Sequence, residues 1–88
     1  MYTDCEGVDP KDLLKELVCH VVDRPEDVHI DAHVTEHSAT FDIHVNDGDL
    51  GMAIGKRGEL AESLRRIFRA IYGKLGKRVY LQVVDPRR

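Results

Sequence analysis

The sequence has few residues that could cross-link a fold or hold a metal. Its 88 residues include no tryptophan and two cysteines, Cys5 and Cys19. These are not paired as CxxC and do not have a zinc-site spacing. Cys5 falls in an expected N-terminal tail and Cys19 on an expected helix, so a structural disulfide is not expected and a reducing compartment fits. Stability must then come from a hydrophobic core, which in so short a chain is modest.

Long apolar runs are also absent. The longest, such as residues 17–19 and 83–84, are far shorter than the ~20 residues that span a bilayer. The N-terminus lacks the basic and then apolar order of a secretory signal. We therefore expect a cytoplasmic protein with no membrane segment.

A set of catalytic groups is missing as well. Catalysis needs a nucleophile, a base and an orienting group that converge on a pocket. Ser38 and Ser63 fall in an expected turn and on an expected helix without a matching base, and the acidic residues are spread along surfaces. The pattern therefore favours a protein that is not an enzyme, with no catalytic residue and no cofactor.

Charged residues are plentiful but unevenly distributed. The formal net charge is −3. Residues 1–49 hold three basic side chains against thirteen acidic ones, a net charge of −10, whereas residues 50–88 hold ten against three, a net charge of +7. A protein with one face toward phosphate and another toward water or a basic partner has this asymmetry. Ordinary solvated helix charges also produce it, so charge alone leaves both interpretations open.

The most informative segment is the turn Gly55-Lys56-Arg57-Gly58, which separates two apolar runs. The two glycines lack the Cβ atoms that keep a ligand away from the backbone. The two cations lie between them, at the point of approach. Gly58 also opens an expected helix, whose first N–H groups lack helical partners and bind anions. The turn therefore predicts a clamp for a nucleic-acid backbone.

Two other interpretations of this turn need to be weighed. A nucleotide-hydrolase phosphate loop has four residues between its glycines and a Ser or Thr after the Lys. Here three residues separate Gly51 from Gly55, and Arg57 follows the Lys, so that interpretation fails. A plain helix connector is the second, because a lone GxxG is a weak signal. Residues 48–51 form another GxxG, without positive charge.

The first helix has a clear start. Asp9 is a good N-cap and Pro10 suits the first helical position, while Pro25 stops the helix. Its expected apolar stripe consists of Leu13, Leu14, Leu17, Val18 and Val21. Alternation over residues 28–35 and 41–45 then indicates a hairpin of two half-buried strands.

The second half of the chain contains two helices and a strand. We expect a short helix at about 50–54 that Asp49 caps, and a long helix from Glu59 that Gly76 closes. The expected apolar stripe of the long helix is Leu60, Leu64, Ile67, Phe68, Ile71 and Leu75. A strand over 79–83 follows. Laying three helices on one side of a three-stranded sheet buries every apolar face, so the fold class is α+β.

This order and turn together resemble a KH domain, whose core is a strand, a short helix, a GxxG turn, a longer helix and a strand. The helix and strand placed before that core resemble the type II, prokaryotic arrangement, α-β-β-α-α-β. In detail, the sequence resembles the KhpA family of small bacterial stand-alone KH proteins. The residues that carry this resemblance are Ile54-Gly55-Lys56-Arg57-Gly58, Ala61, Leu64 and Arg65, then Gly76-Lys77-Arg78-Val79.

The resemblance covers roughly residues 10–84. It implies a single KH domain over residues 9–86, with its three-stranded sheet covered on one face by three helices. An acidic, flexible tail is expected at residues 1–8 and a basic end at residues 87–88.

The resemblance also implies a function. KH domains hold about four single-stranded nucleotides in a shallow groove, and the GxxG turn clamps their backbone. The implied role is that of an RNA chaperone or post-transcriptional regulator. The RNA-binding residues that it implies are Ile54, Gly55, Lys56, Arg57, Gly58, Leu60, Ala61, Leu64 and Arg65. Among these, Ala61 and Leu64 would help form an aliphatic floor, and Arg65 could equally be paired with Glu62 on the helix surface.

The implied partners are single-stranded RNA and another KH protein. Pairing with a second copy or with a larger KhpB (Jag)-type protein would follow from the resemblance. An alternative is a protein-interaction module whose main role is this pairing, with RNA binding secondary. The broad apolar stripe of the long helix, which includes Ile67, Phe68, Ile71 and Tyr72, is expected to be mostly core, and an edge of it left exposed would suit this pairing.

Histidines gather on the two strands of the expected hairpin. A turn at residues 38–39 would place His33 opposite His44 on the outward face, which also holds Asp31 and Asp42. Two imidazoles and a carboxylate can hold zinc. Polar residues on the solvent side of a hairpin are nevertheless the ordinary expectation, and no ligand spacing recurs. We therefore predict no metal site.

Overall fold

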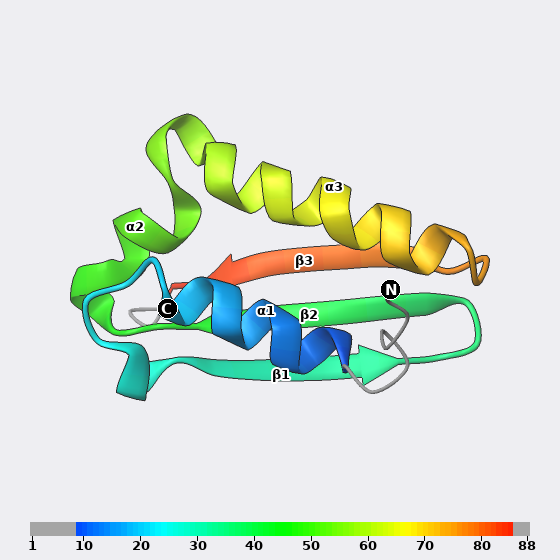
Figure 1. Ribbon diagram of the computed structural model, residues 1–88, viewed down its shortest axis with the longest axis horizontal. Helices are drawn as coiled ribbons and strands as arrows, with labels where there is room; N and C mark the ends of the chain where they lie inside the picture. Colours follow the sequence, from blue (N-terminus) through cyan, green and yellow to red (C-terminus); the bar gives the residue numbers. More distant parts are fainter. Residues whose placement is uncertain (1–8, 86–88) are drawn as a thin grey trace, which may run out of the picture.

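Residues 9–85 are described by the computed structural model in Figure 1. The elements are α1 (Pro10–Cys19), β1 (His29–Val34), β2 (Ser38–His44), α2 (Leu50–Ile54), α3 (Glu59–Gly73) and β3 (Arg78–Val84). This is the predicted order, and the α+β fold class is confirmed. The expected tail at residues 1–8, with Cys5, and the basic end at 87–88 lie outside the described residues. Within residues 9–85, no helix is long and apolar enough to cross a membrane.

The three strands form one mixed sheet in the order β1-β2-β3. β1 and β2 are antiparallel, whereas β2 and β3 are parallel. Parallel strands need a crossover connection, and here the crossover consists of α2, the following turn and α3. Figure 1 shows α1 against β1 and β2, and α3 running along β3. The helices thus cover one face, and β3 forms an edge of the sheet.

The first helix begins as predicted. The side chain of Asp9 accepts a hydrogen bond from the N–H of Lys11 at 2.9 Å, and Pro10 follows the cap. The helix ends at Cys19, well before Pro25, and Val22 in the segment between them is buried. The expected apolar stripe is therefore too wide. Its buried members are Leu14 and Val18, while Leu17 and Val21 stay exposed.

The long helix packs through a narrower line of side chains than predicted. Its buried residues are Ala61, Leu64, Phe68 and Tyr72. Ile67 is 47% exposed and Leu75 64% exposed, because α3 meets the sheet along one side. The ring of Phe41 on β2 makes an edge contact with Phe68, with centroids 5.4 Å apart. Burial, and then the charge of Asp9, raises the pKa of Tyr72.

Gly76 closes the region after α3 as predicted. It has φ +71°. Its N–H donates to the carbonyl of Gly73 at 3.1 Å, and the N–H of Lys77 donates to the carbonyl of Tyr72 at 3.1 Å. These two bonds are the Schellman pattern. The side chain of Lys77 also donates to the carbonyl of Thr35, which ties this end of α3 to the β1–β2 turn.

The predicted hairpin turn at residues 38–39 is wrong. The turn spans residues 35–38, where the N–H of Thr35 donates to the carbonyl of Ser38 at 2.8 Å. The hydroxyl oxygen of Thr35 accepts from the N–H of Ser38 at 3.0 Å and so stabilises the earlier turn. Consequently His44 lies opposite His29, and His33 lies opposite Thr40.

The corrected register brings two histidines to one carboxylate on the outer sheet face. Nε2 of His29 lies 2.8 Å from Oδ1 of Asp31, and Nε2 of His44 lies 3.0 Å from Oδ2. The hydrogen bond from His29, with a smaller one from His44, holds the pKa of Asp31 below its ordinary value. Within residues 9–85, no group of three or more His, Cys, Asp or Glu side chains is arranged to hold a metal ion.

Candidate nucleic-acid interface

The turn between α2 and α3 has an unusual backbone. After α2 ends at Ile54, Gly55 has φ 84° and ψ 166°, Arg57 has φ 58° and Gly58 has φ 75°. Residues without a Cβ enter this part of φ space at little cost, and other residues do so only with strain. The N–H of Gly58 donates to the carbonyl of Gly55 at 3.0 Å and closes the turn. Both glycines of the motif are therefore placed where the backbone needs them.

The two glycines are needed for different reasons. A Cβ on Gly55 would lie 2.7 Å from both the Cβ and the N of Leu60, so the first turn of α3 packs directly on the bare backbone. A Cβ on Gly58 would meet no heavy atom within 4 Å in the described part of the chain. Glycine is thus needed at position 55 because a Cβ would clash with Leu60 and because φ is positive. At position 58 it is needed only because φ is positive.

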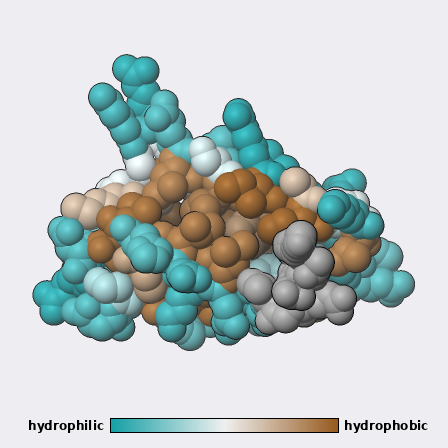
Figure 2. Space-filling view, in the orientation of Figure 1, coloured by the Kyte–Doolittle hydropathy of each residue, from teal (hydrophilic) through white to brown (hydrophobic). Residues whose placement is uncertain are grey.

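The turn is open to solvent, as its predicted role requires. Lys56 and Arg57 are exposed. Among residues 9–85, neither side chain makes a hydrogen bond or an ion pair. Figure 2 shows hydrophilic side chains that project from the end of the molecule where Figure 1 places the α2–α3 turn. A phosphate at this turn would therefore meet two cations without displacing an existing ion pair.

The start of α3 adds a smaller electrostatic contribution. Gly58 is its N-cap and supplies no side-chain hydrogen bond, so part of the first turn of N–H groups stays open. These groups and the helix dipole attract an anion. Glu59 and Glu62 lie in the same first turn and offset that attraction. The two cations of the turn are thus the main attraction for phosphate.

A groove lies between α2 and the end of β3. Its volume is about 410 Å³, and its lining consists of Leu50 and Ile54 from α2, Gln82, Val83 and Val84 from β3, and Asp85. Four of the six lining residues are aliphatic, and Gln82 and Asp85 add polar side chains. The groove is therefore suited to flat apolar groups that carry polar edges.

One wall of this groove is the open edge of β3. Nε of Arg65 donates to the carbonyl of Leu81 at 2.9 Å, so that carbonyl faces away from β2. Alternate residues of a strand direct their peptide groups to the same side, so the N–H and C=O of Val83 also face the open edge. An edge strand offers such groups for pairing. The wall can therefore hydrogen-bond a ligand through its backbone.

The predicted site residues fall into four groups in the structure. Ile54 lines the groove, with residues 55–58 directly after it. Ala61 and Leu64 are each 4% exposed and lie beneath the surface. Arg65 is engaged, since it binds Leu81 and also donates to Oε1 of Glu62 at 3.2 Å. Leu60 is half-buried against Gly55. RNA contact at each of these positions stays a prediction.

Five of the six groove residues were not among the site residues predicted from the sequence: Leu50, Gln82, Val83, Val84 and Asp85. Val83 alternates with Val79 and Leu81 on the expected strand, and its place in a groove depends on the strand order, which the sequence does not show. Leu50 begins a helix of five residues, too short for a clear apolar face. The spacing of Leu50 and Ile54, one helical turn apart, was the available signal.

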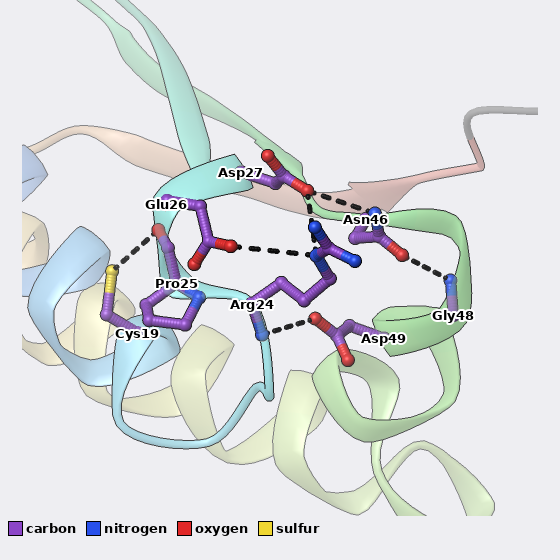
Figure 3. A network of polar contacts seen from close by, with 8 residues as sticks. All are labelled: Cys19, Arg24, Pro25, Glu26, Asp27, Asn46, Gly48 and Asp49. Carbon is purple, nitrogen blue, oxygen red and sulfur yellow. Dashed lines mark hydrogen bonds and ion pairs between the residues drawn. The ribbon is translucent and has the colours of Figure 1, made fainter.

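A polar network fixes the start of α2 (Figure 3). Asp49 lies at the N-cap position of α2 as predicted, but its carboxylate bonds no α2 N–H, and Oδ2 instead accepts from the N–H of Arg24 at 2.9 Å. Nε of Arg24 lies 3.6 Å from carboxylate oxygens of Glu26 and Asp27. Asn46 donates to Asp27 at 3.0 Å. Residues 24–27 and 46–49 are thus joined, and α2 leads from this junction to the turn at residues 55–58.

A mixed sheet whose parallel pair is connected by a helix, a GxxG turn and a second helix defines a KH domain. The helix and strand before that unit give the type II arrangement. The family model described as "KhpA/KhpB, KH domain" matches residues 11–83. The chain belongs to this family, and the resemblance seen in the sequence is confirmed.

Curated relatives agree with this assignment. The RNA-binding protein KhpA of Halalkalibacterium halodurans is 35% identical over 75 residues, which cover 85% of this chain and 99% of the relative. That of Clostridium perfringens is 32% identical over 74 residues, 84% of this chain and 99% of the relative. That of Mycobacterium bovis is 39% identical over 74 residues, 84% of this chain and 89% of the relative.

Proposed function

We propose that this protein binds single-stranded RNA and clamps its backbone with residues 55–58. The observation that carries the proposal is the exposed turn, whose two cations have no partner among residues 9–85, placed next to an aliphatic groove. The relatives compared above carry the name RNA-binding protein, which supports the same ligand.

The proposed binding mode follows from the groove. Phosphates lie against Lys56 and Arg57, and the bases lie on the aliphatic surface of Leu50, Ile54 and Val83. The open backbone of Val83 offers one donor and one acceptor to a base edge. Splayed bases have free edges only in a single strand, so a duplex would not fit this mode.

The proposed affinity is weak and depends on salt. Two cations neutralise about two phosphates, and each phosphate in a single strand contributes about −0.7 to the slope of log K against log salt. The expected slope is therefore about −1.4. Weak contact with many short strands is suited to an RNA chaperone or post-transcriptional regulator, which is the role that we propose.

The test is the double variant Lys56→Asp, Arg57→Asp. Both side chains are exposed, and Asp tolerates the left-handed backbone at position 57, so the fold should persist. Fluorescence polarisation with a labelled random-sequence RNA pool of eight nucleotides, at moderate salt, should show no binding. The matched control is Lys11→Asp, Lys15→Asp, which makes the same charge change on α1 and should bind like the wild type. A folded double variant that kept wild-type affinity would refute the clamp.

A second function, pairing with another KH protein, is favoured by a separate observation. Figure 2 shows a hydrophobic band between α1 and α3 on the helix-covered face. Leu17 of α1 and Ile67 of α3 are exposed apolar residues, and so are Val21 and Leu75, which follow the two helices. Exposed apolar surface of this kind serves association. We propose pairing with a second copy or with a KhpB-type KH protein.

Sedimentation equilibrium tests the pairing. The wild type should sediment as a dimer and Ile67→Glu as a monomer, because a charge at the centre of an apolar contact opposes association. Ser63→Glu, an exposed change on the same helix, should remain dimeric. A monomeric wild type at high concentration would exclude self-pairing. Adding the RNA pool to the same samples separates pairing from RNA binding.

A further inference from the structure

The groove beside the clamp continues along the edge of β3. A second hollow of about 480 Å³ begins at Gln82, which lines both. The other residues that line it are Thr40, Arg65, Arg69, Val79, Tyr80 and Leu81. Since both hollows follow the same strand and meet at Gln82, a strand that leaves the first hollow in this direction enters the second.

The second hollow is lined by an aromatic ring that is exposed, that of Tyr80. Within residues 9–85, Phe41, Phe68 and Tyr72 are buried, whereas Tyr80 is 54% exposed. Tyr80 lies on β3, paired with Thr40 of β2 and on the face away from the helices. An exposed aromatic face is a stacking platform for a base of any sequence. The fold itself does not need this ring for its core.

Positive charge exceeds negative charge beside this ring. One carboxylate, that of Glu62, faces three guanidinium groups. Arg65 lies 3.2 Å, Arg69 3.5 Å and Arg66 3.8 Å from its oxygens. Arg65 is also held by the carbonyl of Leu81. Arg69 is half-exposed and makes one long contact with Glu62, so it can turn toward a phosphate at little cost.

We propose that this hollow is a subsite for a further nucleotide of the same RNA strand, beyond those in the groove next to the clamp. Its base stacks on Tyr80 and its phosphate pairs with Arg69. The amide nitrogen of Gln82 already donates to Oδ1 of Asp42 at 2.8 Å, so the amide oxygen of Gln82 and the hydroxyl of Thr40 are the groups at the lining that can hydrogen-bond the base edge. A ring, a guanidinium and an amide in one open hollow are the groups that recognise single-stranded nucleotides. The subsite rests on the proposed RNA-binding function.

The experiment compares random-sequence RNA pools of four and of eight nucleotides on wild type and Tyr80→Leu. A KH groove holds about four nucleotides, so both proteins should bind the short pool equally. On the long pool, Tyr80→Leu should bind at least about fivefold more weakly than the wild type, the factor that corresponds to the lower end of base–aromatic stacking. The statistical gain from several binding registers is common to both proteins and cancels in this comparison.

Matched variants separate the subsite from general effects. Tyr80→Phe keeps the ring and should bind like the wild type. His33→Leu alters the same cross-strand row on the outer face, two strands away, and should have no effect. Arg69→Gln should weaken binding of the long pool, whereas Lys74→Gln, which removes one charge at the end of α3, should not. A pool with 5-iodouridine should crosslink to Tyr80 on irradiation.

The outcomes distinguish the subsite from the clamp. If the Lys56→Asp, Arg57→Asp variant loses binding while folded Tyr80→Leu binds the long pool like the wild type, the subsite is overturned and the clamp stands. An equal loss on both pools in Tyr80→Leu also overturns a separate subsite. If the wild type binds neither pool, the proposed function fails and the subsite fails with it.

Discussion

The N–H of Arg24 donates to Oδ2 of Asp49 at 2.9 Å, across 25 positions of sequence. Asp49 is 3% exposed, and among residues 9–85 no other charged side chain is buried. A buried carboxylate is costly unless it is hydrogen-bonded. The bond therefore both stabilises Asp49 and joins the turn before β1 to the start of α2, the helix that leads to the clamp.

Asp49→Ala should lower the free energy of unfolding by about 1–3 kcal/mol, because the Arg24 N–H loses its acceptor in a partly buried place. Asp49→Asn keeps an oxygen at the same position and should cost less. Urea denaturation measures both. Asp23→Ala, an exposed acidic position in the preceding turn, is the control and should be near neutral. Equal stability of Asp49→Ala and the wild type would mean that this bond holds nothing in place.

Gly55→Ala should destabilise the protein by about 3 kcal/mol, since the new Cβ meets Leu60 at 2.7 Å and the backbone is in a region almost reserved for glycine. Gly58→Ala adds a Cβ in open space and should cost about 1 kcal/mol from its dihedral alone. Gly51→Ala, inside α2 with no close neighbour, should be stabilising. Thermal melts of the three variants should follow this order, and any other order would contradict the packing of Leu60 on Gly55.

Arg57→Asn should raise stability and lower RNA affinity together. Arg57 has φ 58°, which Asn adopts with less strain, so a gain of about 0.5 kcal/mol in unfolding free energy is expected. Loss of one cation should reduce the salt slope of RNA binding by about 0.7. Urea denaturation and a salt titration of RNA binding check the two parts. A gain in stability with an unchanged salt slope would show that Arg57 does not face phosphate.

The pKa of Asp31 predicts a stability change in acid. Because the pKa in the folded state is lower than the ordinary 3.8, the folded state binds this proton more weakly than the unfolded state. The stabilisation is therefore complete above about pH 4 and is lost as pH falls through the folded pKa. Urea midpoints between about pH 5 and pH 2 should fall less steeply in Asp31→Asn than in the wild type.

His29→Gln is the companion variant, because the hydrogen bond from His29 is the main cause of the lowered pKa. It should flatten the acid dependence in the same way. His33→Gln, on the same strand but outside this contact, should leave the dependence unchanged. If the urea midpoints of wild type and Asp31→Asn depended on pH in the same way, Asp31 would not contribute to stability in acid.

Local signals in the sequence were sufficient for much of the fold. Asp9 and Pro10 mark the start of α1, and the glycine pattern marks the turn at 55–58 and the end of the long helix at Gly76. Each signal acts through its own neighbours in the chain, by capping, by dihedral preference or by removing a Cβ. The turn that we propose as the clamp could be located for the same reason.

Features that depend on distant partners could not be predicted. The predicted hairpin register was wrong because the turn was placed at the small residues 38–39. The hydroxyl of Thr35 instead stabilises a turn at residues 35–38. Asp49 had the sequence of a helix cap, but its partner is Arg24. The groove wall at Val83 requires the strand order, since an inward-facing valine is core in a central strand and lines a groove at an edge.

The parallel pairing of β2 and β3 limits which sequence changes the turn at residues 55–58 can accept. The chain must travel back along the full length of β2 before β3 can add to the sheet, and residues 55–58 are a fixed step of that return path. An inserted or deleted residue there would shift the last strand out of alignment before it touched any ligand. The two middle side chains, in contrast, are exposed. The return path therefore constrains the length of the turn more than the identity of these two side chains.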